Sequence, residues 1–344
     1  MESFMKIFIL ILFLFTTVCL KCQSILPIAK AQVKVAYINF RPSAFYHKFS
    51  ANIAPVLRIQ PGDTILTETV DAAGYDKTGK KREQGGNPLT GPFFIEGSSA
   101  GDVLAVTIIK LVLNRSTAFT TESFSSRSLL RGLWHDDKRV KIVNWKIDTA
   151  TGFAILSDTS YEHLRDFRVP LRPFLGCIGV APSNNKNEIL SFFQGPFGGN
   201  LDFERITQSA TVYLPVFHEG AYLYVGDGHA LQGDGEIAGN ALETSLDIEF
   251  AVTLIKKESL SINNPRVEDS ADLMAIGVDK SLDKALKIAT SELLTWLQND
   301  YHLSNREATQ VMSTSIEYQV AEIADPNVEV VARIKKDILK QLKK

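Results

Sequence analysis

The sequence predicts a mainly β protein, with an antiparallel β-sandwich core and a smaller α/β portion at the C-terminus. Residues 32–256 consist of short apolar segments, rich in β-branched side chains and interrupted by Gly, Pro and Asn. This pattern is typical of strands and turns. No helical pattern separates the segments, which argues against a parallel βαβ sheet. Apolar residues at helical spacing begin only after about residue 264, so we expect the helices at the C-terminal end.

The strands of the core are expected to follow turns that the sequence marks clearly. The pairs Gly62-Asp63 and Gly101-Asp102 each lead into a run rich in β-branched residues, as turn chemistry favours. The predicted strands cover residues 31–40, 103–113, 211–215, 221–225 and 246–256.

The C-terminal portion is expected to begin with two helices. Apolar residues recur at helical spacing over residues 279–299, and Ser304 with Glu307 matches a capping box that opens a second helix. Residues 317–325 return to a strand pattern, and residues 332–344 are predicted to form a basic helix. The chain therefore divides into a β-sandwich core over residues 23–264 and an α/β subdomain over residues 265–344.

The first 22 residues are predicted to be a signal peptide. Lys6 is followed by an apolar run that is too short to span a membrane and that lies at the extreme N-terminus. Cleavage is expected after Cys22, with Ala31 as a later alternative. We therefore expect an exported protein, periplasmic or secreted, with no membrane span once the signal is removed.

The charge balance argues against a nucleic-acid-binding protein, and the cysteine content excludes a fold held by intrachain disulfides. The chain has 37 basic and 39 acidic residues, so it lacks the positive charge that nucleic-acid binding requires. Of its three cysteines, Cys19 and Cys22 lie in the predicted signal. Only Cys177 remains in the mature chain, which therefore cannot form an intrachain disulfide.

The most informative segment is residues 227–236, which place three carboxylates, an imidazole and a carboxamide among three glycines. Glycine disfavours a helix here, and the segment is too polar for a typical buried strand, so we expect a tight loop. Its side chains are of the types that bind a divalent cation. Their spacing matches neither an EF-hand nor a helical His-x-x-x-His zinc site. A solvated turn, held by its own carboxylates, is the alternative.

Four segments in order resemble the acetamidase/formamidase family, and the likeness runs from about His47 to the C-terminus. The segments are NPLTGPFFIEG at 87–97, FLGCIGVAP at 174–182, GGNLD at 198–202 and GDGHALQGDGE at 226–236. The resemblance implies a β-sandwich core with an α/β tail, and an amidase that hydrolyses a small linear amide such as formamide or acetamide. A metal would supply the nucleophilic water and stabilise the carbonyl oxygen, while a carboxylate would protonate the departing ammonia.

The resemblance and the residue chemistry together nominate a set of site residues. Asp227 and His229 are expected to bind the metal, with Asp202 as a further ligand. The catalytic candidates are Glu236, Glu96 and Asp234; we expect a raised pKa for Glu96, because it follows three large apolar residues. The candidates for substrate binding are His47, Asp71, Asn200 and Gln232. Zinc is the first choice of metal, with calcium and manganese as alternatives, and the protein is expected to form a homo-oligomer.

Two other nucleophile patterns fail on their context. Ser99 lies in a Gly-x-Ser-x-Gly sequence, but that motif needs a following helix, and here a strand is expected at residue 103. Cys177 has apolar and glycine neighbours and no adjacent base, so we expect a small buried residue and not a thiolate.

Two other functions stay open from the sequence. The chain could be a non-catalytic β-sandwich binding module, in which the acidic loop holds a structural calcium and nearby aromatics such as Tyr222 and Tyr224 contact a ligand. It could also keep the family's fold and hydrolyse a different amide-like substrate, since export is unusual for an enzyme that acts on a permeable amide.

Overall fold

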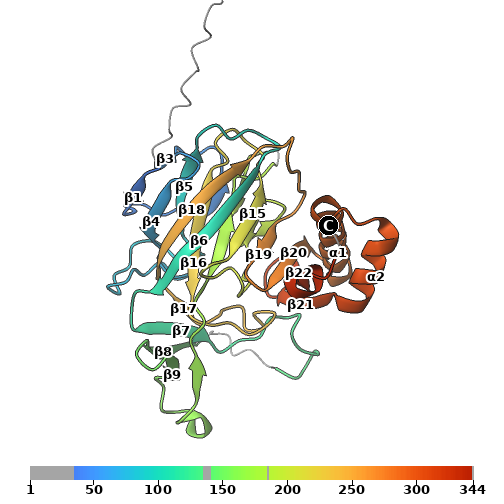
Figure 1. Cartoon of the computed structure of the whole chain (residues 1–344). Helices are drawn as coiled ribbons and strands as arrows, with labels where there is room; N and C mark the ends of the chain where they lie inside the picture. Colours follow the sequence, from blue (N-terminus) through green and yellow to red (C-terminus); the bar gives the residue numbers. More distant parts are fainter. Residues whose placement is uncertain (1–34, 135–140, 184–185, 343–344) are drawn as a thin grey trace, which may run out of the picture. The chain divides into compact units, whose positions relative to one another are not determined.

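The computed structural model describes residues 35–134, 141–183 and 186–342, so the predicted signal peptide lies outside the described residues. Two large sheets and one small sheet make up the fold (Figure 1). The pairing between strands is mostly antiparallel, as predicted. The two parallel pairs recorded are β1 with β4 and β3 with β5.

The first large sheet has nine strands. Their order is β1 (Tyr37–Asn39), β4 (Thr64–Glu68), β18 (Leu246–Ile255), β6 (Val103–Leu113), β15 (Thr211–Pro215), β19 (Arg266–Glu268), β20 (Asp272–Asp279), β22 (Val328–Lys335) and β21 (Glu317–Glu322). The strands after residue 264 continue this sheet, because β19 pairs with β15 along its edge.

The second large sheet has eleven strands. The main path runs β10 (Arg168–Pro170), β9 (Phe153–Leu156), β8 (Ile142–Asp148), β7 (Thr117–Thr121), β17 (Glu243–Thr244), β16 (Leu223–His229), β11 (Phe174–Gly179), β14 (Gly198–Asn200) and β13 (Gln194–Gly195). Beside it, β5 (Leu89–Ile95) pairs with β16, and β3 (Leu57–Ile59) pairs with β5. A small separate sheet joins β2 (Lys48–Ser50) to β12 (Glu188–Leu190).

The main core lies between the two large sheets. Phe93 of β5 and Phe250 of β18 are both fully buried, and their rings meet edge to face at 5.5 Å. Val106 and Leu175, from the first and second sheets, belong to the same apolar cluster. Burial of alternate side chains, as along β18, is what a sandwich requires of strands that face a core on one side.

The helices follow β20 and cover one part of the first sheet. α1 (Leu282–Tyr301) packs its buried Leu293 and Trp296 with Leu273 of β20 and Ile334 of β22. α2 (Asn305–Ser315) begins with the predicted capping box, in which Ser304 and Glu307 exchange hydrogen bonds. Short turns of helix occur at η1 (Glu162–Leu164) and α3 (Lys336–Leu339). Among the described residues, no helix has the length and apolarity needed to cross a membrane.

Two predicted elements are wrong. The expected helix over 332–344 is instead the end of β22 followed by the four-residue α3, because β22 pairs with β20 on one side and β21 on the other. The expected loop at 227–236 begins as strand, since β16 continues through His229. Glycines at 226 and 228 let neighbouring strands approach this part of β16, where a Cβ would come within 3.0 Å of another chain segment.

Candidate active site and metal centre

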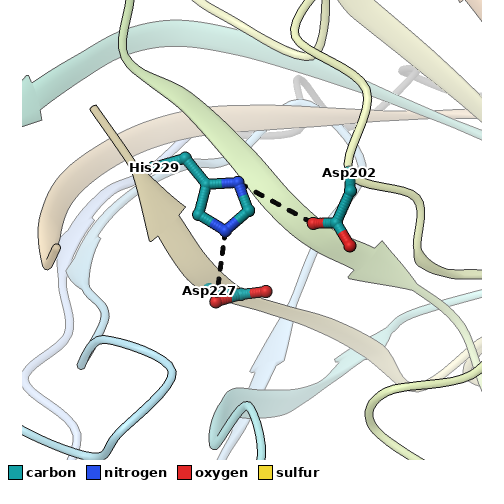
Figure 2. Close-up of side chains that lie close together, drawn as sticks. All are labelled: Asp202, Asp227 and His229. Atoms are coloured by element: carbon teal, nitrogen blue, oxygen red, sulfur yellow. Dashed lines mark ion pairs between the residues drawn. The ribbon is translucent and has the colours of Figure 1, made fainter. Parts of the chain in front are cut away.

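The second sheet brings together three polar side chains from two separate segments. Asp227 and His229 lie at the end of β16, and Asp202 follows β14. Both strands pair with β11, which lies between them. The His229 imidazole therefore lies between two carboxylates (Figure 2). Its Nδ1 is 3.8 Å from Asp202 Oδ1, and its Nε2 is 3.6 Å from Asp227 Oδ1.

Three more carboxylates adjoin this group. Glu243 of β17 places Oε2 3.2 Å from His229 Nε2. Glu236 has ligand atoms within 4.8 Å of His229 and Glu243, and also within 4.8 Å of Asp202 and Glu322. These six residues are called the acidic cluster below: Asp202, Asp227, His229, Glu236, Glu243 and Glu322. Each of them is at most 7% exposed.

Several polar atoms of the acidic cluster have no hydrogen-bond partner within the protein. They are both ring nitrogens of His229 and one oxygen each of Asp202, Asp227, Glu243 and Glu322. A buried polar atom without a partner destabilises a fold by about 1–3 kcal/mol. Six such atoms in one place fit a bound cation, because a divalent ion takes carboxylate oxygen and imidazole nitrogen as ligands.

The electrostatics indicate the same need for a cation. Burial raises the pKa of Asp202 and of Glu236 well above the usual range, and neighbouring carboxylates raise both further. Burial also raises the pKa of Glu322 to about 7. For His229, burial lowers the pKa, but the charges of Glu243 and Asp227 outweigh it and raise the pKa well above 6.5. So many carboxylates cannot all be ionised in a buried space unless positive charge joins them.

Gly176 of β11 leaves room at the centre of this group. A Cβ at this position would lie 2.6 Å from Asp202 Oδ1, 2.9 Å from His229 Cε1 and 3.0 Å from Asp227 Oδ2. The first two distances are shorter than real Cβ contacts, and the third is tighter than most of them. Only glycine therefore lets the three candidate ligands come together over β11.

Asparagine side chains hold the two aspartates in place. Asn87 Nδ2 donates to Asp227 Oδ2 and to Asn200 Oδ1, both at 2.9 Å. Asn200 Nδ2 donates to Asp202 Oδ2 and, at 3.0 Å, to Asp325 Oδ2. Such outer hydrogen bonds orient ligands around a metal. The predicted substrate-binding residue Asn200 thus lies at the site, where its contacts are with the candidate ligands.

Gln232, predicted to bind substrate, also reaches the acidic cluster. Its Nε2 donates to the carbonyl oxygens of Asp202 at 2.6 Å and of Ala321 at 3.3 Å. Two carbonyl acceptors fix the orientation of the side-chain amide. Its Oε1 is left buried and without a partner, so it remains available to accept a hydrogen bond.

Besides Glu96, three predicted residues lie away from the acidic cluster. Asp71 forms a buried ion pair with Arg115, with 2.5 Å between Oδ2 and Nη2. His47 is half-exposed and contacts the loop before Asn87, where its Nδ1 is 3.3 Å from Gly86 O. Asp234 is exposed and accepts a hydrogen bond from Gln319 at 2.6 Å. None of these three touches the unpartnered atoms of the acidic cluster.

The expectation of a raised pKa for Glu96 is wrong. Arg58 forms an ion pair with its carboxylate at 2.5 Å, and this hydrogen bond holds the pKa of Glu96 below its usual value. Leu89, at the start of β5, pairs with Gly226, the residue before Asp227. Glu96 follows the other end of the same strand. Seven residues of strand place it about 20 Å from the start of β5, so Glu96 is not a catalytic candidate.

Sequence reasoning missed Glu243, Glu322 and Asn87. Asn87 opens the NPLTGPFFIEG segment, so its place in a family-like motif was a usable signal. Glu243 and Glu322 lie in or at the end of strands, among apolar or unremarkable neighbours. Only the pairing of β17 with β16, and the bridge between Gly235 and Glu322, bring them to the site.

The two rejected nucleophiles behave as expected. Gly97 to Gly101 form a turn that leads directly into β6. Cys177 is fully buried and donates to Asn200 Oδ1. Burial, and then the charge of Asp227, raises the pKa of the thiol well above its usual value.

Comparisons with known proteins agree with this picture. The model of the Acetamidase/Formamidase family matches residues 38–190 and 196–341. An acetamidase from Mycolicibacterium smegmatis is 47% identical over 60 residues, which is 17% of this chain and 15% of that protein. A formamidase from Methylophilus methylotrophus is 38% identical over 76 residues, which is 21% of this chain and 19% of that protein. These aligned parts span less than a fifth of either relative.

A solved structure matches over a much greater length. The crystal structure of an acetamidase from Yersinia enterocolitica has a TM-score of 0.77 and 27% sequence identity, and the match covers 91% of this chain and 96% of that chain. The resemblance seen in the four sequence segments is confirmed, as is the mainly β fold.

Proposed function

Because the chain belongs to the acetamidase/formamidase family, we propose that it hydrolyses a small linear amide to a carboxylate and ammonia with the help of a bound divalent cation. The observation that carries the proposal is the set of buried, unpartnered oxygen and nitrogen atoms around His229. Asp202, Asp227 and His229 lie in segments that resemble the family's own, at a place where Gly176 keeps the space free.

Asp202, Asp227 and His229 would hold the cation, since their ligand atoms lie within 4.8 Å of one another. When bound, a divalent ion polarises the amide carbonyl and lowers the pKa of water. Zinc suits this mixture of carboxylate and imidazole best, and manganese and calcium are the alternatives.

Glu236 is the best candidate for the proton transfers. Burial and neighbouring carboxylates raise its pKa well above the usual value, which favours the protonated form. A protonated carboxyl can donate that proton to the departing nitrogen, which leaves as ammonia. Gln232 Oε1, buried and unpartnered, can accept a hydrogen bond from the substrate's amide nitrogen and orient it.

The two glutamates beside His229 differ in environment. Glu243 Oε2 lies 3.2 Å from His229 Nε2, and its Oε1 accepts the backbone N–H of Ala241 at 2.9 Å. Burial raises the pKa of Glu243 above its usual value, although His229 and the Ala241 N–H favour the ionised form. On the basis of its contact with the ring, we assign Glu243 to holding the imidazole, and Glu236 to the proton.

The proposal is tested by measuring ammonia and carboxylate released from formamide, acetamide and propionamide by the purified protein. Equal amounts of both products are expected. Glu236→Gln should reduce release at least 100-fold, whereas the matched change Asp234→Asn, at an exposed site on the same segment, should keep it. Full activity in Glu236→Gln, or its loss in Asp234→Asn, would contradict the assignment.

No observation favours the binding-module alternative. Tyr224 is fully buried and its hydroxyl donates to Ser50 O, while Tyr222 packs against Phe94. Neither tyrosine is an exposed aromatic platform. Export and homo-oligomer formation remain proposals. The apolar run after Lys6 supports the first, and the strong exposure of Leu130 (79%) and Leu133 (70%) supports the second.

A further inference from the structure

A cavity of about 220 Å³ adjoins the acidic cluster. Its walls come from β7, β8, β10 and the segment after β16. The lining includes Trp145, Val169, Leu231, Gln232, Glu236 and Leu242. Two further lining residues, Gly233 and Ile237, are exposed, so the cavity is reached from the surface beside them.

The cavity meets the proposed catalytic groups directly. Glu236 belongs both to the cavity lining and to the acidic cluster. Gln232 also lines the cavity, and its unpartnered Oε1 is the acceptor proposed above for an amide nitrogen. A carboxamide held by these two side chains would have its acyl group in the rest of the cavity.

The remaining wall is mostly apolar and fixed in position. Trp145 is 9% exposed, and its Nε1 donates to Thr120 Oγ1 at 2.9 Å. Its ring meets the edge of Phe167 at 6.1 Å. Val169, Leu231 and Leu242 complete this wall and pack in the same apolar cluster as Trp145.

The volume is too large for the smallest amides. This volume of 220 Å³ is several times the share of about 30 Å³ that one water molecule has in the liquid. The acyl hydrogen of formamide or the methyl group of acetamide would leave most of this space to water against apolar side chains. An apolar group that displaces this water gains binding free energy in proportion to the area it buries.

We propose that the enzyme selects amides with an apolar acyl group of about four to seven carbons, aliphatic or aryl, and that Trp145 and Val169 set this preference. The inference rests on the proposed amidase function and adds its substrate class. The proposed preference depends on the residues that line the cavity, and it is the same whichever divalent ion supports the reaction.

The first test is the dependence of kcat/KM on acyl length, measured as ammonia release from formamide, acetamide, propionamide, pentanamide and benzamide. Each buried methylene is worth about fourfold, so kcat/KM should rise on the order of 50-fold from acetamide to pentanamide. Release that is greatest with formamide and falls with acyl length would overturn the inference and leave the amidase function standing. No release from any of these amides would instead contradict the proposed function.

The second test fills the cavity. Val169→Phe adds a ring to the half-buried wall on β10, and should lower the ratio of kcat/KM for pentanamide to that for acetamide at least tenfold. Lys146→Phe is the matched control, because residue 146 is exposed on β8 beside Trp145 and outside the cavity lining; it should keep the ratio. An unchanged ratio in Val169→Phe, in protein that melts as cooperatively as the wild type, would overturn the role of this wall.

Discussion

Replacing Gly176 with alanine should abolish cation binding at the proposed metal site while leaving the fold intact. Gly176 lies in β11, and its φ is outside the positive range that side chains avoid, so alanine is compatible with the backbone. Its methyl group would lie 2.6 Å from Asp202 Oδ1, whereas an ordinary contact begins at 3.4 Å. The carboxylate must therefore retreat by the difference, 0.8 Å.

That displacement is large for a metal ligand. Coordination distances are held to within about 0.2 Å, and a misplacement of about 1 Å at a reaction centre can cost about 100-fold in rate. His229 and Asp227 would also have to move, because the same methyl group lies 2.9 Å and 3.0 Å from their atoms. We expect cation affinity and ammonia release each to fall at least 100-fold.

The assay combines calorimetric titration of zinc into chelated protein with ammonia release and a thermal melt. Gly85→Ala is the matched control, since its nearest neighbour would lie at an ordinary 3.4 Å, and it should bind zinc as the wild type does. Wild-type affinity and activity in a folded Gly176→Ala protein would show that Asp202, Asp227 and His229 do not hold the cation over Gly176.

Three further variants test a candidate ligand, a hydrogen bond that orients a ligand, and the stability of the fold in acid. His229→Asn should lose both cation binding and at least 100-fold of the ammonia release, because it removes the one imidazole among the carboxylates. Asn87→Ala, which deletes the hydrogen bond to Asp227, should weaken zinc binding about 10–100-fold, as measured by titration. Asp76 tests acid stability away from the site. Burial raises its pKa, but hydrogen bonds led by that from the Thr78 side chain outweigh this and lower it to about 2 from 3.8. Because the folded pKa is the lower one, ionised Asp76 stabilises the fold above about pH 4, and this is lost as the pH falls towards 2. Asp76→Asn should therefore lower the free energy of unfolding by about 2 kcal/mol at pH 6 and by little at pH 2, as measured by urea titration. An equal loss at both pH values would show that the ionised form of Asp76 is not the source of the stabilisation.

The sequence predicted those parts of the fold that local chemistry decides. The strands at 103–113 and 211–215 have the predicted bounds, because β-branched runs between turns have few other conformations. The capping box at Ser304 is confirmed for a similar reason, since its two hydrogen bonds involve residues only three apart.

The sequence could not predict where strand pairing overrides composition. Polar residues 227–229 continue β16 because the strand pairs with β11 and β17, and because their side chains meet other ligand-type groups. Residues 332–335 are strand because β20 and β21 hold both edges of β22. Buried polar groups in a strand are tolerable only with a partner, and that partner lies far away in the sequence.

The sequence predicted the site residues that lie in the polar, glycine-rich segments, but not those that only strand pairing brings to the site. Asp202, Asp227, His229, Glu236, Asn200 and Gln232 come together as a group. Glu96 and Asp234 occupy similar glycine-flanked positions in the sequence, yet Glu96 follows the far end of β5 and pairs with Arg58, while Asp234 lies in an exposed turn and pairs with Gln319. Nothing local to residues 243 and 322 distinguishes them from ordinary strand glutamates, and only the sheet brings them to His229 and Glu236.

The most direct test of the metal-assisted amidase is ammonia release from acetamide and pentanamide during titration of chelated protein with zinc, manganese or calcium. A metal-assisted reaction predicts no release after chelation, and recovery that follows cation binding in the wild type but not in His229→Asn. Undiminished release from protein shown to be free of metal would contradict it.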